Sequence, residues 1–483
     1  MHTQIAIIGT GFAGLGTAIH LQKRGLTDFV LLEEAASVGG TWRDNTYPGC
    51  ACDVPSHLYS FSFELNPNWS RQFAPQDEIR AYIEHCAEKY GLMPRIEFNS
   101  RVEEARWDED DQLWRLSIRG GRTLTARFVV FCLGGLREPR FPQIPGRDSF
   151  AGPTMHSTRW RHDVDLKGLR VGVIGTGASA IQVVPGIAER TGHLTLFQRT
   201  AAWVRPRQDA AISPRRQAFY RRFPLAMQLE RARIYARYES RWPLFKRGEW
   251  VDRLMRRLME KDIRRAVRDT QLADKLIPAY KPACKRVLLS DDFYPALQRE
   301  DVDLEVSRIV EIVPDGAVLA DGRKIELDAI VYCTGFEIEY GQVQIYGNGG
   351  VNLIDYWDRR PRAYLGLTVP GFPNSFTILG PNTALGHNSV IVMIEAGIRY
   401  TVAAIEYALD NDLADLDLRE DALAAFVSEV DSKHRGLVWA SGCDSWYLGE
   451  DGVNFTLWPG STLAYIQRTR HFDPSMYRST GAE

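Results

Sequence analysis

Two glycine-rich fingerprints constrain the fold of this chain more than any other feature of its sequence. The first is Gly9-Thr10-Gly11-Phe12-Ala13-Gly14 and the second is Gly175-Thr176-Gly177-Ala178-Ser179-Ala180, and each stands between a short β-branched run and a helical pattern. In this context the glycines allow a tight turn and let the backbone approach a pyrophosphate, which rests on the helix N-terminus. One match is weak evidence. Two predict an α/β protein with two Rossmann-like dinucleotide-binding domains that pass electrons between their dinucleotides.

Length and composition are compatible with this fold and exclude several other classes of protein. The 483 residues suffice for two or three domains, and 45% of them are hydrophobic. Because 59 basic residues nearly balance 61 acidic ones, we expect no nucleic-acid partner. No apolar run approaches the roughly 20 residues of a membrane span, so we expect no stable membrane insertion. The seven cysteines are scattered and odd in number, which is typical of a reducing cytoplasm, and Cys50 and Cys52 lack the further ligands of a metal site.

The pattern of strands and helices divides the chain into two units of the same plan. The first begins with a strand over 4–9, a helix over 13–24 and a strand over 28–33, and its hairpin turns at Gly120-Gly121. The second repeats this plan with a hairpin over about 308–333. We predict one domain from 1–140 and 340–483, completed by a helix over 389–409, a second from 141–204 and 281–339, and a helical insertion over 205–280.

The insertion is rich in arginine, lysine and aromatic residues at helical spacing. Arg253-Leu254-Met255-Arg256-Arg257-Leu258-Met259 is an example. A basic amphipathic helix of this kind can lie on a membrane surface. A helical subdomain with a solvated face explains the same pattern, and the sequence favours it because no stronger anchor is present.

Residues at the ends of two strands indicate which dinucleotide each unit binds. Glu33 ends the second strand of the first unit, where an acidic side chain accepts hydrogen bonds from a ribose diol. This position suits the adenosine end of FAD, and the adjacent Glu34 is a second candidate. The corresponding strand of the second unit ends in Gln198-Arg199-Thr200, without an acid. Because Arg199 can pair with a 2′-phosphate, we expect an FAD-binding first domain and an NADP-binding second domain that prefers NADPH to NADH.

A third motif lies between the fingerprints. Gly39-Gly40-Thr41-Trp42, Tyr47-Pro48-Gly49 and Asp53 together resemble the flavin-site signature of type I Baeyer–Villiger monooxygenases. The stretch Phe150-x-Gly152-x3-His156-x3-Trp160 is similar to the diagnostic sequence of that family, which usually ends in Pro or Asp where this chain has Arg161. Later blocks that share the resemblance are 282–286, 386–389, 442–447 and 458–460.

The resemblance implies an activity and a set of site residues. Proteins of this family use FAD, NADPH and O2 to insert oxygen next to a ketone carbonyl through a C4a-peroxyflavin, and they release an ester or lactone. Arg286 would be catalytic by stabilising negative charge, and Asp53 would hold that arginine. Lys285 would contact the 2′-phosphate, and His156 would have a structural role in the linker. With the fingerprints, the resemblance predicts cofactor contacts at Gly9, Gly11, Phe12, Ala13, Gly14, Glu33, Gly40, Thr41, Trp42, Asp53, Tyr59, Gly175, Gly177, Ala178, Ser179, Arg199, Thr200, Lys285 and Trp446.

Three other functions are compatible with two dinucleotide-binding domains. A flavin monooxygenase that oxidises nitrogen or sulfur shares both fingerprints, but the sequence over 150–160 disfavours it. A pyridine nucleotide–disulfide reductase needs a redox-active cysteine pair, and the single residue between Cys50 and Cys52 would strain a disulfide. A non-catalytic flavin-binding sensor would have no need of Arg286 and Asp53.

Overall fold

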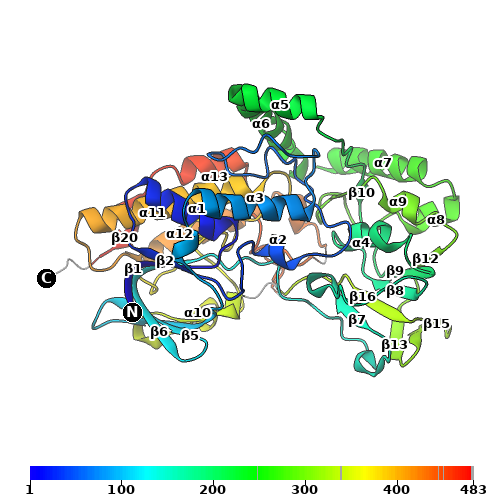
Figure 1. The fold of residues 1–483 in the computed structure, drawn as a ribbon, viewed down its shortest axis with the longest axis horizontal. Helices are drawn as coiled ribbons and strands as arrows, with labels where there is room; N and C mark the ends of the chain where they lie inside the picture. Colours follow the sequence, from blue (N-terminus) through cyan, green and yellow to red (C-terminus); the bar gives the residue numbers. More distant parts are fainter. Residues whose placement is uncertain (247, 338–339, 444, 450, 480–483) are drawn as a thin grey trace.

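The computed structural model of the chain contains two α/β lobes that lie side by side, with a helical segment above them (Figure 1). It describes residues 1–246, 248–337, 340–443, 445–449 and 451–479. The beginning and the last third of the chain form the larger lobe, and the middle of the chain forms the smaller one (Figure 1). None of the helices in the described residues combines the length and the apolar character that a membrane-crossing segment requires.

The larger lobe is built on an eight-stranded sheet. Its strands are β1 (His2–Ile8), β2 (Phe29–Leu32), β3 (Ile96–Glu97), β4 (Val102–Asp108), β5 (Leu113–Ile118), β6 (Arg122–Phe131), β17 (Gln344–Tyr346) and β18 (Ser375–Thr377). β1 precedes the first fingerprint and lies between β2 and β6, parallel to both. The first half of β6 pairs with β5, which confirms the predicted hairpin, and its last residues pair with β18. The first fingerprint therefore opens at the carboxyl edge of the parallel strands.

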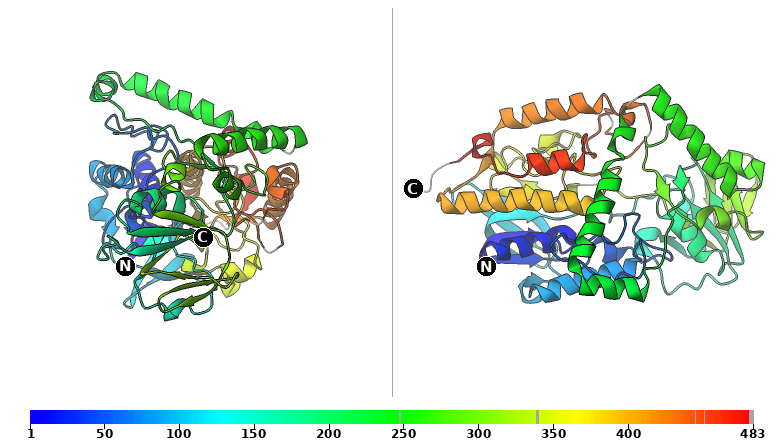
Figure 2. Two further views of the ribbon diagram at one scale, coloured as in Figure 1. Left: turned by 90° about the vertical axis from the view of Figure 1, so that its right-hand side faces the viewer. Right: turned by 90° about the horizontal axis from the view of Figure 1, so that it is seen from above.

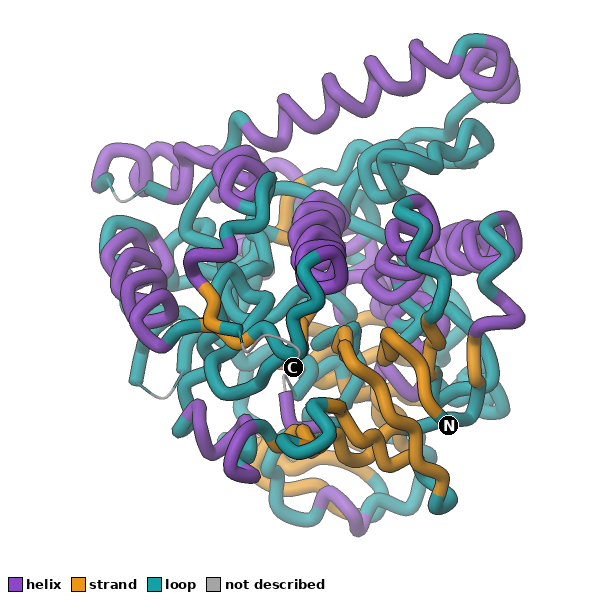
Figure 3. The backbone as a smooth tube through the Cα atoms, turned by 90° about the vertical axis from the view of Figure 1, so that its left-hand side faces the viewer, coloured by secondary structure: helices purple, strands orange, loops and turns teal. Residues whose placement is uncertain are grey.

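Helices cover one face of this sheet (Figure 3). The helix expected over 389–409 is α11 (Val390–Asp410), of whose 21 residues 14 are buried, as a helix that is apolar nearly all round requires. It packs against α1 (Phe12–Lys23) at Gly16, where an added Cβ would lie 2.8 Å from Cδ1 of Ile398. The other helices of the lobe are α2 (Thr41–Asp44), α3 (Gln76–Lys89), α10 (Leu353–Trp357), α12 (Glu420–His434) and α13 (Thr462–Arg468), and a short ribbon joins β19 (Asp417–Leu418) to β20 (Tyr477–Arg478).

The smaller lobe is built on a five-stranded sheet in which all strands are parallel. In spatial order the strands are β12 (Val302–Glu305), β9 (His193–Phe197), β8 (Arg170–Ile174), β16 (Ala329–Tyr332) and β7 (Thr154–His156). The helix after the second fingerprint is α4 (Ala180–Ile187), and α9 (Phe293–Ala296) is the other helix of this lobe. The hairpin expected over 308–333 is a three-stranded antiparallel sheet of β13 (Ile309–Val313), β14 (Gly316–Leu319) and β15 (Lys324–Glu326), and β16 leaves it to join the parallel sheet.

The insertion is helical, as the sequence predicts. It contains α5 (Pro214–Arg222), α6 (Pro224–Glu239), α7 (Glu249–Ala266) and α8 (Thr270–Lys275). Two short parallel strands, β10 (Val204–Arg205) and β11 (Leu288–Leu289), close it at its base. Figure 2 shows α5 and α6 on the upper side of the molecule, where Arg231 of α6 donates to the carbonyl oxygens of His57 and Leu58 in the larger lobe.

Candidate active site and cofactor cradles

The first fingerprint forms a tight turn that only glycine can adopt. Gly9 has a φ of +103°, and an added Cβ on Gly14 would lie 1.9 Å from the carbonyl oxygen of Gly9. Gly11 faces Gly40, whose added Cβ would lie 3.2 Å from the Cα of Gly11. Two glycines from separate segments therefore leave a narrow slot between their backbones. Phe12, Ala13 and Gly14 form the first turn of α1, and Thr41 begins α2.

Glu33 stands beside this slot at the carboxyl end of β2. Its Oε2 accepts hydrogen bonds from the backbone N–H of Thr10 (3.0 Å) and from the hydroxyl of Thr10 (2.6 Å). Its Oε1 accepts from the N–H of Ala35 (3.0 Å) and from Nη1 of Arg43 (2.8 Å). Glu34 instead pairs with Arg137. The structure thus places Glu33 next to the fingerprint loop, and a ribose diol would share its oxygens with these donors.

Three aromatic rings gather near the fingerprint helix. The indole Nε1 of Trp42 donates to the hydroxyl of Tyr59 (3.1 Å), and the two ring centroids are 5.6 Å apart. The ring of Phe12 lies 5.4 Å from that of Tyr59 in an edge-to-face arrangement. Residues from three segments of the chain therefore form one aromatic cluster, which suits a flat cofactor ring.

Arg286 and Asp53 form a two-pronged ion pair. Nε of Arg286 donates to Oδ2 of Asp53 at 2.7 Å, and Nη2 donates to Oδ1 at 2.8 Å. The side chains are 33% and 28% exposed, so the pair borders an opening. Burial alone would raise the pKa of Asp53, but the charge and hydrogen bonds of Arg286 outweigh it and hold that pKa below its usual value. The charge of Asp53 in turn raises the pKa of Arg286, which stays cationic.

A second contact fixes the segment that carries this arginine. Cys284 and Cys443 form a disulfide, which the scattered spacing of the seven cysteines did not indicate. The bond ties the arginine segment to the loop that holds Tyr447. Burial raises the pKa of Tyr447 to about 12 although Arg286 lies near it. Cys50 and Cys52 are buried free thiols, so the pair that a disulfide reductase would need is not bonded.

The second fingerprint repeats the turn but leaves more room. Gly175 has a φ of +114°, and an added Cβ would lie 2.3 Å from the carbonyl oxygen of Cys333. An added Cβ on Gly177 would meet nothing within 4 Å, so the loop there is open to a ligand. Ala178 and Ser179 follow in the turn that leads into α4.

Arg199 and Thr200 lie at the same edge of the smaller sheet as the second fingerprint. β8 and β9 are parallel neighbours, and the hydroxyl of Thr176 donates to the carbonyl oxygen of Thr200 at 2.6 Å. Arg199 is exposed. Lys285 places its ammonium group 5.0 Å from the centre of the Tyr280 ring. Its segment leads into β11, which pairs with β10 just after Thr200.

Trp446 is a predicted contact that lies partly at the surface. Its side chain is 46% exposed, and its ring lies 4.5 Å from that of Tyr447. Cys443, three residues before Trp446, ties this part of the chain to the segment that carries Arg286.

Sequence reasoning missed Gln182, which joins the two lobes. Its Oε1 accepts from the hydroxyl of Tyr47 (3.0 Å), and its Nε2 donates to the carbonyl oxygen of Ala51 (2.9 Å). Gln182 lies one turn into the helix after the second fingerprint, whereas Tyr47 and Ala51 belong to the motif that ends at Asp53. The sequence offered one signal of this contact, which is the amide side chain of Gln182 on the helix after the second fingerprint.

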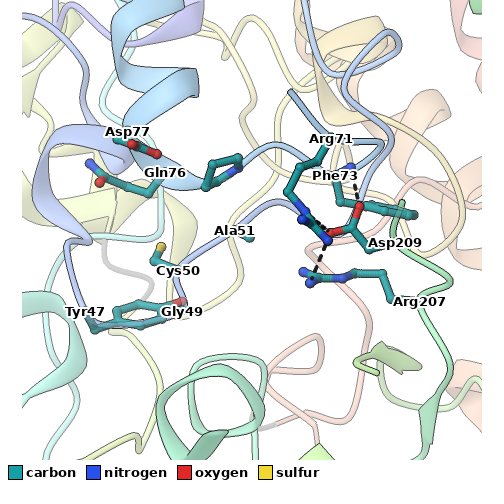
Figure 4. Close-up of a pocket in the computed structure, with 11 residues that line it drawn as sticks. Tyr47, Gly49, Cys50, Ala51, Arg71, Phe73, Gln76, Asp77, Arg207 and Asp209 are labelled. Carbon is teal, nitrogen blue, oxygen red and sulfur yellow. Dashed lines mark hydrogen bonds and ion pairs between the residues drawn. The ribbon is translucent and has the colours of Figure 1, made fainter. Parts of the chain in front are cut away.

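A cavity of about 350 Å³ opens beside this junction (Figure 4). Figure 4 shows Arg71, Arg207 and Asp209 on one side of it and Tyr47 and Cys50 on the other. Asp209 accepts a hydrogen bond from Nε of Arg71 at 2.7 Å. The buried Nε of Arg207 has no hydrogen-bond partner among the described residues. The sequence contains no motif that marks this arginine.

Three buried histidines predict an acid-sensitive fold. Burial lowers the pKa of His57, His156 and His434 to about 4, against roughly 6.5 in an unfolded chain. Between about pH 6.5 and about pH 4 the unfolded chain binds protons that the folded protein does not. The free energy of unfolding therefore decreases as the pH is lowered, by about 2 kcal/mol per histidine at pH 5 relative to neutral pH. We expect a lower melting temperature at pH 5 than at pH 7 and a smaller difference in His156→Asn. Equal melting temperatures of the parent protein at the two pH values would contradict this.

Comparisons with known proteins identify the family to which the chain belongs. A family model described as pyridine nucleotide-disulphide oxidoreductase matches residues 6–232. A Baeyer-Villiger monooxygenase of Streptomyces coelicolor is 44% identical over 483 residues, covering 99% of this chain and 92% of the relative. A solved steroid monooxygenase bound to NADP has a TM-score of 0.90 at 30% identity, with 100% of both chains covered. OTEMO, solved in complex with FAD and NADP, has a TM-score of 0.90 at 27% identity, with 99% of both chains covered. The chain therefore belongs to the Baeyer–Villiger monooxygenases and is an FAD- and NADPH-dependent flavoprotein monooxygenase.

Proposed function

We propose that this protein converts a ketone and O2 into an ester or lactone at the Arg286–Asp53 pair. The observation that carries the proposal is the two-pronged contact between these residues at the meeting point of the two lobes. In this proposal the domain of 1–140 and 340–483 binds FAD, the domain of 141–204 and 281–339 binds NADP, and 205–280 is a helical insertion within the second of these domains.

Two glycine-lined spaces, which we call the glycine cradles, fit the two dinucleotides. The slot between Gly11 and Gly40 and the open loop at Gly177 each leave space where a pyrophosphate can meet backbone amides. In this proposal Phe12, Trp42 and Tyr59 would provide an aromatic surface for the flavin, and Arg199, Thr200 and Lys285 would contact the 2′-phosphate. When bound and reduced by NADPH, FAD would activate O2, which provides the inserted oxygen atom.

Arg286 has the chemistry to stabilise negative charge on oxygen. Its guanidinium remains cationic beside Asp53, and a donor that is already oriented costs no reorganisation when charge develops. Nη1 also donates to the carbonyl oxygen of Leu385 at 3.3 Å, which holds the far end of the group. Asp53 is a positioning residue in this scheme, because it acts through Arg286.

Steady-state turnover with a panel of ketones tests the proposal. NADPH oxidation by the FAD-loaded protein should rise when a linear, cyclic, aromatic or steroid ketone is present, and mass spectrometry should detect a product heavier by one oxygen atom. Formation of sulfoxides or N-oxides with no ester or lactone would favour the alternative, a nitrogen- or sulfur-oxygenating flavin monooxygenase. The cytoplasmic location, the absence of a nucleic-acid partner and the NADPH preference stay predictions.

Gly11→Val is expected to remove FAD without unfolding the protein. An added Cβ on Gly11 would lie 3.9 Å from the Cα of Gly40, which is ordinary contact, so the fold tolerates it. The two further methyl groups of valine would fill the slot in which the pyrophosphate rests. Flavin absorbance per chain measures the effect. The control is Gly436→Ala, outside the cradle, where an added Cβ would lie 3.7 Å from the carbonyl oxygen of Lys433, an ordinary contact. Full flavin content in Gly11→Val would refute the assignment.

A further inference from the structure

The helical insertion has a basic and apolar surface that the proposed reaction does not use. Between 205 and 280 the chain has 20 Lys and Arg against 9 Asp and Glu, a net charge of +11, whereas the whole chain has −2. Of the 16 large hydrophobic side chains that are exposed in the described residues, 8 lie in this range. Positive charge and exposed apolar area are therefore concentrated in the same part of the molecule.

Helix α7 carries both properties on its outer face. Trp250, Leu254 and Leu258 recur every four residues and are 70%, 42% and 52% exposed. Arg253 and Arg257 lie beside this stripe, are exposed, and form no ion pair with the acidic side chains that the structure describes. The residues that the helix buries, on its inner side, are Met259 and Ile263. Exposed apolar side chains that adjoin one another, rather than being scattered singly, are typical of an interaction surface.

The hairpin of α5 and α6 adds a second apolar strip on the same side of the molecule. Leu225 and Leu229 of α6 are 72% and 71% exposed, and Phe219 and Phe223 are 48% and 52% exposed. The two phenylalanine rings lie 5.1 Å apart. In the view from above, α6 and α7 both lie uncovered on the near side (Figure 2), which is the upper side of Figure 1. The helices that carry the two strips therefore lie uncovered on the same side of the molecule (Figure 2).

We propose that α5, α6 and α7 dock the protein on an anionic lipid surface. Helices that lie in a membrane interface combine Trp, Phe and Leu on one face with Lys and Arg around it. Arginines near such a surface are attracted to anionic headgroups. Trp250, Leu254, Phe223 and Leu229 would enter the interface. The contact is peripheral, it needs no membrane-crossing helix, and it does not depend on the proposed reaction.

Sedimentation with lipid vesicles tests this proposal. The FAD-loaded full chain is mixed with phosphatidylcholine vesicles that contain about 30% phosphatidylserine, and with vesicles of phosphatidylcholine alone. We expect binding to the anionic vesicles only, weakened at least about tenfold by roughly 0.5 M salt, which shortens the range of the attraction. No binding to anionic vesicles, or equal binding to both kinds, would overturn the proposal. Binding of duplex DNA or RNA without vesicle binding would also overturn it and assign the surface to nucleic acid.

Two double variants locate the contact. Trp250→Gln/Leu254→Gln removes apolar side chains, and Arg253→Glu/Arg257→Glu reverses two charges. Each double variant should weaken vesicle binding by about tenfold or more. NADPH oxidation in solution should be unchanged in both. The matched control is Val351→Gln/Ile354→Gln, which changes two side chains that are 47% and 41% exposed near α10, on the lower side of Figure 1. If the control weakened binding as much as the α7 variants, or if those variants bound like the parent protein, the docking surface would be refuted.

Discussion

Arg286→Ala is expected to lose oxygen insertion while the protein still binds FAD and NADPH. The guanidinium that would stabilise developing negative charge is removed, whereas both glycine cradles are unchanged. Loss of one oriented donor of this kind typically costs about 10²–10³-fold in rate. The measurement is the amount of ester or lactone formed per NADPH consumed. Hydrogen peroxide is measured in parallel, because it forms when O2 is reduced without oxidation of the ketone. Normal product yield would show that Arg286 has no catalytic role.

Conservative and remote variants separate catalysis from folding. Arg286→Lys should restore little, because an ammonium group cannot make the two-pronged contact with Asp53. Asp53→Asn should lie between the parent and Arg286→Ala, since the arginine remains but loses its anionic partner. Arg299→Ala is the matched control. Its side chain makes a similar two-pronged contact with Asp301, at 2.9 and 3.0 Å, and this pair belongs to no cofactor cradle. It should keep normal activity, and a loss as large as that of Arg286→Ala would indicate general damage.

The parts of the site that follow from local backbone requirements could be predicted from the sequence. Gly9 and Gly175 both adopt positive φ at the end of a parallel strand, and the pattern of glycines alone indicates such turns. The hairpin at Gly120-Gly121 and the helix of 390–410 followed from periodicity in the same way. Arg286 and Asp53 were identified through the family resemblance, because nothing in general physics links two residues so far apart in the chain.

Contacts between distant segments could not be read from the sequence. Cys284 and Cys443 are separated by 159 positions, and scattered cysteines give no sign of which pair the fold brings together. Gln182 joins the lobes because α4 faces the loop of Tyr47, which depends on how the lobes are placed. The position of Glu33 at the end of a strand predicted a carboxylate beside the fingerprint. It did not predict that Thr10, Ala35 and Arg43 donate hydrogen bonds to that carboxylate.

Arg199→Ala is expected to raise the apparent KM for NADPH by about 10–150-fold and to change that for NADH little. NADH lacks the 2′-phosphate, so only NADPH loses a contact. A charge-assisted hydrogen bond contributes roughly 1.5–3 kcal/mol, which gives this range. Arg199 is exposed and follows β9 at the edge that carries the second fingerprint, so its removal leaves the core intact. Steady-state kinetics with both coenzymes at a fixed ketone concentration measure the effect.

Comparing the KM values for NADPH and NADH distinguishes a contact of Arg199 with the 2′-phosphate from a general effect on the site. Arg199→Lys should keep part of the NADPH preference, because an ammonium group still attracts a phosphate although it cannot bind it with a planar fork. Arg190→Ala is the control, since this arginine is also exposed and lies in the same domain. It should leave both KM values unchanged. If Arg199→Ala weakened NADPH and NADH equally, the residue would contribute to the shape of the site, and the 2′-phosphate would have to be recognised by Lys285 or Thr200.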